Sequence, residues 1–330
     1  MKSPAFRRLL GLIAVAGLLL TAIAYAQQQQ TLRRVGFFSA GTSESTADWI
    51  TAFRQGMAQL GWNEGRDYII DARYGNGVMQ ALPKVAAELL STNPDIIVTT
   101  SESSIKVLAE STSTIPIVFG VANDPVKLGF AHSLQRPGRN VTGFTNSAPE
   151  LGAKRLQLLK ELAPRLKHVT LVFQQNDLAS ASQLDDIAKA ASVLGLQVVQ
   201  SAVRQATDLE SAFKRGAESG THGYILTTGP LFNIHRYALA QYVSKSKAPA
   251  VFSHTLYAEA GGLLSYSPSY TDNFRRAAGY VDKILKGVKA TDLPIETPNK
   301  YELTVNLRTA KAARIAIPKS ILLRADRIIE

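Results

Sequence analysis

Apolar and polar positions along the chain form short strand-like runs separated by segments with helical spacing. The first strand-like runs are Arg34 to Ser39, Tyr68 to Tyr74, Asp95 to Thr99 and Ile115 to Val121. Apolar spacing between them predicts helices over 47–60, 79–90 and 103–110. Strands and helices that alternate in this way predict a parallel sheet with helices on both faces.

The pattern starts again after a segment rich in Gly, Asn and Ser. This segment, 137–146, is the predicted boundary between two α/β units of similar size. In the second unit we expect helices over 151–162, 179–194, 209–218 and 234–246, and strands over 168–173, 197–202, 223–227 and 250–252.

The C-terminal part of the chain departs from this repeat. It contains a predicted strand at 262–266, an amphipathic helix at 273–285, a proline-rich stretch at 294–298 and a strand at 302–305. This part is too short for a third domain, so we expect it to complete both units. We therefore predict an N-terminal lobe of residues 27–145 plus 268–298 and a C-terminal lobe of residues 146–267 plus 299–330.

The first residues have the pattern of a secretory signal peptide. Lys2, Arg7 and Arg8 precede an apolar run from Leu9 to Ala24, and Ala24-Tyr25-Ala26 fits a small-x-small cleavage site. We expect residues 1–26 to be removed on export. The chain has no cysteine, which excludes disulfides and a lipid on an N-terminal cysteine. The expected location is the periplasm, without a lipid anchor.

Charge gives little support for a nucleic-acid partner. The formal net charge is +11, but the three positive charges of the leader contribute to it, and the rest are scattered without an aromatic-interleaved basic run. We expect no nucleic acid to bind.

Three stretches resemble a family of bacterial ABC-transporter substrate-binding proteins, in a branch associated with tryptophan and other aromatic or amino-acid-like solutes. They are PIVFGVANDPVKLGF at 116–130, PGRNVTGFTN at 137–146 and the C-terminal run ILKGVKATDLPIETPNKYELTVNLRTAKAARIAIPKSILLRAD. The resemblance implies the type I periplasmic-binding fold, with two lobes hinged by three crossovers and a ligand in the cleft. It also implies a small-molecule solute, an ABC permease in the inner membrane as partner, a monomer and no cofactor.

Candidate ligand-binding residues follow from the architecture, because ligands of open parallel sheets bind beyond the carboxyl ends of the strands. In the first unit these are Ser39, Gly41, Thr42, Ser101, Glu102, Ser103, Ala122, Asn123 and Asp124. In the second they are Gln175, Asn176, Thr228, Gly229, Ser253 and His254, together with Tyr266 and Tyr270 beside the last hinge.

Several of these residues have two interpretations. Glu102 either faces the cleft, where it favours a ligand with an amino or other donor group, or complements the dipole of the helix it begins. Asp124 is predicted mainly as the N-cap of a helix with Pro125 at its first position, which leaves Ala122 and Asn123 to face the cleft. Each tyrosine either stacks on a flat ligand or packs the hinge.

Enzymatic patterns are weak in this sequence. The five histidines lack metal-ligand spacing, and no G-x-S-x-G motif occurs. We expect no catalytic residue and no metal site. The predicted function is capture of a small polar or aromatic solute for ABC import. The alternatives are a ligand sensor for a membrane receptor, and an exported enzyme that uses Asp124, Glu102 or His254.

Overall fold

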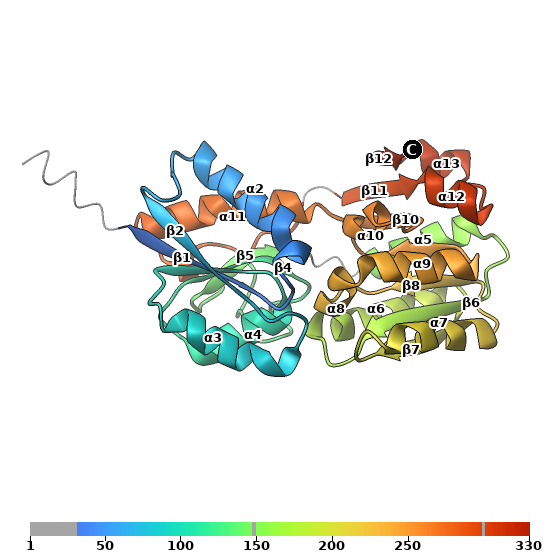
Figure 1. Cartoon of the computed structure of the whole chain (residues 1–330), viewed down its shortest axis with the longest axis horizontal. Helices are drawn as coiled ribbons and strands as arrows, with labels where there is room; N and C mark the ends of the chain where they lie inside the picture. Colours follow the sequence, from blue (N-terminus) through green and yellow to red (C-terminus); the bar gives the residue numbers. More distant parts are fainter. Residues whose placement is uncertain (1–31, 147–149, 299–300) are drawn as a thin grey trace, which may run out of the picture.

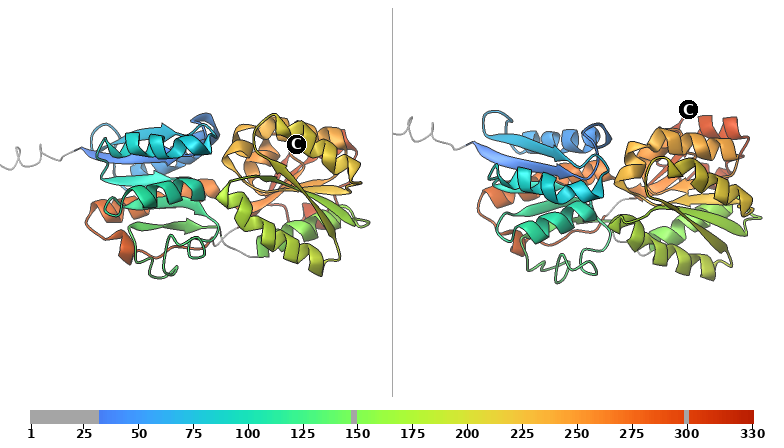
Figure 2. Two further views of the ribbon diagram at one scale, coloured as in Figure 1. Left: turned by 90° about the horizontal axis from the view of Figure 1, so that it is seen from below. Right: turned by 60° about the horizontal axis from the view of Figure 1, so that its bottom comes forward.

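Two lobes, each built on one β-sheet, make up the protein. The computed structural model describes residues 32–146, 150–298 and 301–330; the predicted leader lies outside the described residues. Figure 1 shows the lobes side by side, and the views in Figure 2 show helices on both faces of each sheet. In the described part of the chain, no helix combines the length and apolar character that a membrane crossing requires.

The first sheet is parallel throughout and has the strand order β2-β1-β3-β4-β5. Its strands are β1 (Arg33–Ser39), β2 (Tyr68–Tyr74), β3 (Ile96–Thr99), β4 (Ile117–Ala122) and β5 (Val141–Thr145). The helices of this lobe are η1 (Glu44–Thr46), α2 (Ala47–Gln59), η2 (Met79–Ala81), α3 (Leu82–Leu90), α4 (Glu102–Ser111), α11 (Tyr270–Leu285) and η3 (Ala290–Asp292).

The second sheet has the order β12-β11-β10-β9-β8-β6-β7 and is parallel except where β10 meets β11. Its strands are β6 (His168–Gln174), β7 (Gln197–Val203), β8 (Gly223–Leu226), β9 (Ala250–Phe252), β10 (Leu264–Pro268), β11 (Tyr301–Asn306) and β12 (Arg327–Ile329). Its helices are α5 (Glu150–Leu162), α6 (Leu178–Val193), α7 (Asp208–Glu218), α8 (Pro230–Ile234), α9 (Arg236–Ser246), α10 (Thr255–Glu259), α12 (Leu307–Ala313) and α13 (Lys319–Leu322).

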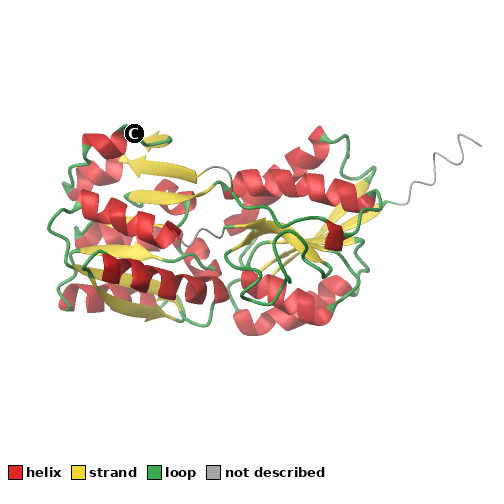
Figure 3. Cartoon of the chain, turned by 180° about the vertical axis from the view of Figure 1, so that it is seen from behind, coloured by secondary structure: helices red, strands yellow, loops and turns green. Residues whose placement is uncertain are grey.

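The chain passes between the two lobes three times. The passages lie between β5 and α5, between β10 and α11, and between residue 298 and β11. Figure 3 shows α11 in the lobe of the first sheet, although the strands before and after it belong to the second. The C-terminal part thus contributes to both lobes, as predicted: α11 belongs to the first, and β11 and β12 belong to the second. The exact lobe boundaries stay a prediction.

Alternation along the strands forms a separate apolar core on each face of the first sheet. Phe37 and Phe38 are consecutive and both fully buried, but they belong to different core clusters. Phe37 packs with α2 and α11 on one face, and Phe38 packs with α3 and α4 on the other. This arrangement follows from the period of two in a strand, which sends successive side chains to opposite faces.

Helices α2 and α11 approach each other closely at Gly56. A Cβ atom on Gly56 would lie 2.3 Å from the backbone oxygen of Arg275 and 2.8 Å from the Cβ of Ala278. Only glycine fits this contact without a shift of the helices. The close approach fixes the position of α11 and therefore of Tyr270 at its start.

One strand was not predicted, and one predicted helix is not found. The segment 137–146 contains the unpredicted strand β5, whose residues are all buried. Gly143 marks a close backbone contact there, since a Cβ atom would lie 2.0 Å from the oxygen of Phe119. No helix follows Pro125: Asp124 accepts a hydrogen bond from the Lys127 N–H at 2.9 Å and so caps a series of turns.

Candidate ligand-binding site

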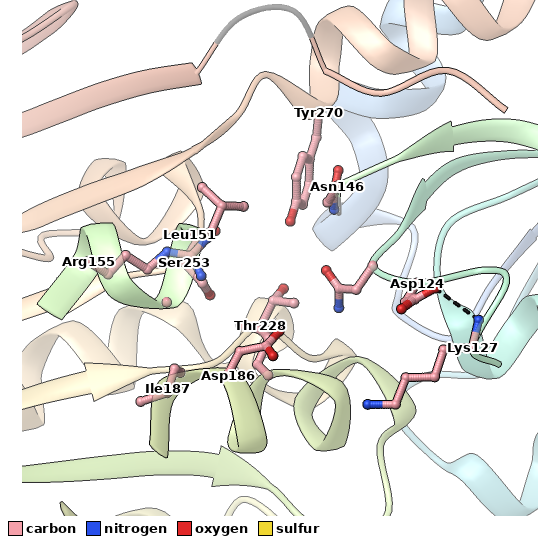
Figure 4. Close-up of a pocket in the computed structure, with 13 residues that line it drawn as sticks. Asp124, Lys127, Asn146, Leu151, Arg155, Asp186, Ile187, Thr228, Ser253 and Tyr270 are labelled. Carbon is pink, nitrogen blue, oxygen red and sulfur yellow. Dashed lines mark hydrogen bonds between the residues drawn. The ribbon is translucent and has the colours of Figure 1, made fainter. Parts of the chain in front are cut away.

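Two adjoining pockets lie between the lobes, at the carboxyl ends of the strands. The first is a cavity of about 110 Å³ that opens to solvent (Figure 4). Its lining comes from both lobes: Asn123, Asp124, Lys127, Asn146, Leu151, Gly152, Arg155, Gln183, Asp186, Ile187, Thr228, Ser253 and Tyr270. In Figure 4 the Tyr270 hydroxyl and the Arg155 side chain approach the same space from different sides.

Arg155 is the main charged group of this first pocket. Its side chain is buried, and α5 places it there from the same helix face as Leu151 and Leu159. The guanidinium donates from Nε to the Tyr266 carbonyl at 2.9 Å and from one Nη to the Ser253 carbonyl at 3.3 Å. No carboxylate pairs with it in the described part of the chain. Burial lowers the pKa of Arg155 to about 10, so it remains a cation at neutral pH.

Several other polar side chains of the first pocket have buried atoms without a hydrogen-bond partner within the described part of the protein. Among the described residues, both amide atoms of Asn146, the hydroxyl of Ser253 and Oε1 of Gln183 are buried without a hydrogen bond. An unpaired buried polar group costs roughly 1–3 kcal/mol, so such groups are usually satisfied by protein, water or a ligand. The Arg155 guanidinium, the Asn146 amide N–H and the Ser253 hydroxyl are donors suited to a carboxylate or another small anionic group. Further charged residues also line this pocket: Asp124, Lys127 and Asp186.

The second pocket is smaller, about 30 Å³, and shares Thr228 and Tyr270 with the first. Its lining also includes Ser39, Gly41, Ser45, Thr46, Trp49, Thr100, Ser101, Glu102, Val121, Ala179, Gly229, Pro230 and Asn233. Aromatic rings form one side of it. Trp49 stacks on Phe274 with centroids 5.4 Å apart, and lies edge-on to Tyr270 at 6.0 Å. Flat aromatic surfaces of this kind favour a planar apolar group.

Glu102 and Asp177 bring two buried carboxyl groups to the interface between the lobes. Glu102 begins α4 in the first lobe, and Asp177 is the N-cap of α6 in the second, where its Oδ1 accepts from the Ser180 N–H at 2.9 Å. Burial and, to a smaller extent, the charge of Asp177 raise the pKa of Glu102 to about 7, although backbone hydrogen bonds oppose this. Burial likewise raises the pKa of Asp177 to about 6, although hydrogen bonds from Ser180 and Ser103 oppose this.

His254 is held as a neutral side chain beside the pockets. Its Nδ1 accepts from the Leu256 N–H at 2.9 Å, which assigns the proton to Nε2. The ring lies 4.1 Å from that of Tyr270 and 5.9 Å from that of Trp49. Burial and the charge of Arg155 lower its pKa to about 3. His254 therefore joins the aromatic cluster and does not line either pocket.

Most of the predicted ligand-binding residues lie in the pocket walls. Those that line a pocket are Ser39, Gly41, Ser101, Glu102, Asn123, Asp124, Thr228, Gly229, Ser253 and Tyr270. Glu102 is the first residue of α4, where it can complement the helix dipole, and it also lines the second pocket. The two interpretations of its position are therefore compatible.

The remaining predicted residues lie outside both linings. Ala122 is buried in the core cluster of Phe38, because its side chain faces the α3–α4 side of the sheet. Gln175 bonds to Arg204 at 2.7 Å, Asn176 occupies an exposed turn with φ 65°, and the Tyr266 ring stacks on Tyr301. The two others, Thr42 and Ser103, form hydrogen bonds to Ser45 and Asp177.

Arg155, Trp49, Asn146 and Asp177 were not predicted as site residues. Arg155 lies in the run LGAKRLQLLKEL, where neighbouring lysines make it resemble a solvated face. Its position four residues after Leu151 and four before Leu159 was the available signal, because that spacing places it on the apolar stripe. A charged residue on an apolar stripe is a candidate for a buried, functional charge.

Comparison with known proteins agrees with this geometry. A sequence profile described as ABC transporter substrate binding protein matches residues 42–329. The chain belongs to this family. Its two lobes have the type I periplasmic-binding architecture that the sequence resemblance implied, which confirms the predicted fold class. The family consists of solute-binding proteins and is not a family of enzymes.

Individual relatives and solved structures show the same similarity. A tyrosine-binding protein of Clostridioides difficile is 24% identical over 266 residues, which cover 79% of this chain and 74% of that protein. The structure of an ABC domain in complex with L-Trp from Streptococcus pneumonia has a TM-score of 0.84 at 22% identity, covering 91% of this chain and 100% of that one. A conserved domain protein from Vibrio cholerae has a TM-score of 0.85 at 23% identity, with coverage of 90% and 100%.

Proposed function

We propose that this protein is the solute-binding component of an ABC import system and that its solute is an amino acid with an aromatic or similarly flat side chain. The observation that supports this most directly is Arg155, a buried cation without a carboxylate partner in the described residues, located in the wall of an inter-lobe pocket. The carboxylate of an amino acid supplies the missing partner. The aromatic cluster around Trp49 supplies a surface for the side chain.

The relatives support the same class of solute. One of them is named for tyrosine binding, and a structural neighbour contains L-Trp. In this proposal the ten predicted residues in the pocket walls contact the solute, together with Arg155, Trp49 and Asn146.

Capture takes place by closure of the two lobes on the solute. Hydrogen bonds between described residues connect the lobes directly: Ser103 Oγ donates to Asp177 Oδ2 at 3.2 Å, and Asn123 Nδ2 donates to the Ala179 carbonyl at 3.3 Å. A solute that contacts both lobes stabilises this closed arrangement by its differential affinity. The closed monomer then docks on the permease, and no bond in the solute is made or broken.

The proposal includes export by residues 1–26. The basic residues, apolar run and Ala24-Tyr25-Ala26 site favour cleavage after Ala26 and release into the periplasm without a lipid anchor. Mass spectrometry of the protein expressed from its full gene in a bacterium with two membranes would show a mature chain that begins at Gln27.

Calorimetric titration of the mature protein tests the proposed solute class. The panel contains the twenty common amino acids, aryl carboxylic acids, pentoses, hexoses and nucleosides. We expect micromolar or tighter binding of at least one aromatic amino acid and no binding of sugars. Binding of a sugar or nucleoside alone would contradict the amino-acid assignment.

A further inference from the structure

Glu102 has one carboxylate oxygen that is fixed and one that has no partner. Oε1 accepts the backbone N–H of Asn123 at 2.6 Å, whereas Oε2 is buried without a hydrogen bond in the described part of the chain. The whole side chain is inaccessible to solvent, and it lines the second pocket. The bond to Asn123 holds the carboxyl group in place, so the free oxygen is preorganised toward any donor that enters there.

The surroundings of Glu102 make it a strong receptor for a positive group. The charge of Asp177, which has the same sign, acts on Glu102, and no lysine or arginine forms an ion pair with Glu102 among the described residues. Burial of an unpaired carboxylate is costly, and a second carboxylate nearby adds to the cost. A cation or a proton at Oε2 removes that cost.

Tyr270 connects Glu102 with the group that we expect to bind the carboxylate. Tyr270 lines both pockets. Burial raises the pKa of its hydroxyl, the charge of Arg155 acts to lower this pKa, and the charge of Glu102 acts to raise it. The two opposite charges thus act on one hydroxyl at the point where the pockets meet. A single zwitterionic solute near Tyr270 therefore experiences both.

We propose that Glu102 is the specificity-determining residue for the ammonium group of the solute, which donates a hydrogen bond to Oε2 while the carboxylate binds Arg155. This rests on the proposed function, since it assigns a contact within the same site. It assigns to Glu102 the selection of amino acids over carboxylic acids of the same shape that lack the amine.

The first test compares L-tyrosine and L-tryptophan with the corresponding arylpropionates, which differ only by loss of the ammonium group. We expect the wild type to bind each amino acid about tenfold to a hundredfold more tightly than its arylpropionate, the range for a charged hydrogen bond in a buried site. In Glu102→Gln the amide oxygen still accepts from Asn123, but the second position becomes an N–H donor. This preference should fall to about threefold or less.

Glu110→Gln serves as the matched control, since it makes the same change at an exposed position on the same helix and should keep the wild-type preference. Asp186→Asn tests the competing assignment, because it removes a carboxylate from the wall of the first pocket. The preference should fall more in Glu102→Gln than in Asp186→Asn. Loss of the preference in Asp186→Asn but not in Glu102→Gln would overturn the assignment.

The pH dependence of binding gives a readout that a structural role of Glu102 does not produce. The groups that interact with Glu102 electrostatically are Asp177 on α6 and Tyr270 on α11. An arylpropionate brings no cation to Glu102, so Glu102 takes up a proton when the lobes close around this ligand. The affinity for the arylpropionate should therefore fall at least tenfold more than the affinity for the amino acid between pH 5 and pH 7.5. Glu102→Gln should abolish the difference.

The outcomes separate this inference from the proposed function. Amino-acid binding with an unchanged preference in folded Glu102→Gln, or equal wild-type affinity for both members of a pair, overturns the role of Glu102 and leaves solute capture intact. Absence of binding by every amino acid and arylpropionate overturns both. The melting temperature of each ligand-free variant establishes that it is folded.

Discussion

The Ser103 hydroxyl lies 3.2 Å from Asp177 Oδ2 and donates a hydrogen bond that joins α4 of the first lobe to the N-terminus of α6 in the second. This contact exists only when the lobes are together. It therefore contributes to closure and to solute affinity rather than to the stability of either lobe.

Replacement of Ser103 by alanine should weaken solute binding without unfolding the protein. Loss of one such hydrogen bond costs about 1 kcal/mol, which corresponds to roughly a fivefold increase in Kd. Calorimetric titration measures this change, and the ligand-free melting temperature should stay within about one degree of the wild type. Ser111→Ala, at the exposed end of the same helix, is the control and should bind as the wild type does. An unchanged Kd in Ser103→Ala would show that this contact does not contribute to closure.

Gly56 in α2 and Gly279 in α11 should respond in opposite directions to alanine. A Cβ on Gly56 meets the Arg275 backbone oxygen at 2.3 Å, whereas one on Gly279 meets nothing within 4 Å. Gly56→Ala should lower the free energy of unfolding by about 1–3 kcal/mol, since α2 and α11 must separate. Gly279→Ala should raise it by about 0.5–1 kcal/mol, because alanine favours the helix. Urea denaturation measures both, and equal effects would contradict the close packing of the two helices.

His254 should make the protein less stable as the pH falls. Burial lowers its native pKa to about 3, so below the ordinary value near 6.5 the unfolded chain binds a proton that the native protein does not. This destabilisation should reach about 2 kcal/mol at pH 5.

His254→Asn keeps an acceptor for the Leu256 N–H and removes the titration. We expect the wild type to lose about 2 kcal/mol more than this variant between pH 7.5 and pH 5, measured by urea denaturation. His132→Asn, at an exposed position, controls for the loss of a histidine as such. Parallel pH profiles for the wild type and His254→Asn would show that the imidazole is not held neutral.

The fold could be predicted from the sequence because its signals are local. Buried parallel strands such as Ile117–Ala122 form continuous apolar runs, and the helices between them have regular apolar spacing. The strand β5 was missed because glycine and polar residues resemble a loop in sequence. Gly143 is there for a close contact with Phe119, and a contact between residues distant in sequence has no local signal.

The candidate site could be predicted only in part, for a related reason. Asn123, Thr228 and Ser253 follow strands, so strand ends alone place them at the cleft. Arg155 lies on a helix, and its proposed role depends on the absence of a carboxylate partner within the described ranges, which only the packed structure shows. The prediction that Ala122 faces the cleft depended on which way one side chain points at the end of a strand, and the pairing register with β5 shifts between Phe119 and Ala122.

The central claim is that Arg155 receives the carboxylate of an amino acid held between the two lobes. Calorimetric titration of the mature protein with L-tyrosine and L-tryptophan, each compared with its carboxamide, tests this claim most directly. The amides keep the ammonium group and the ring but lose the negative charge. We predict that at least one acid binds and that its amide binds at least a hundredfold more weakly, because the buried guanidinium is left unpaired. Equal binding of acid and amide would contradict the account.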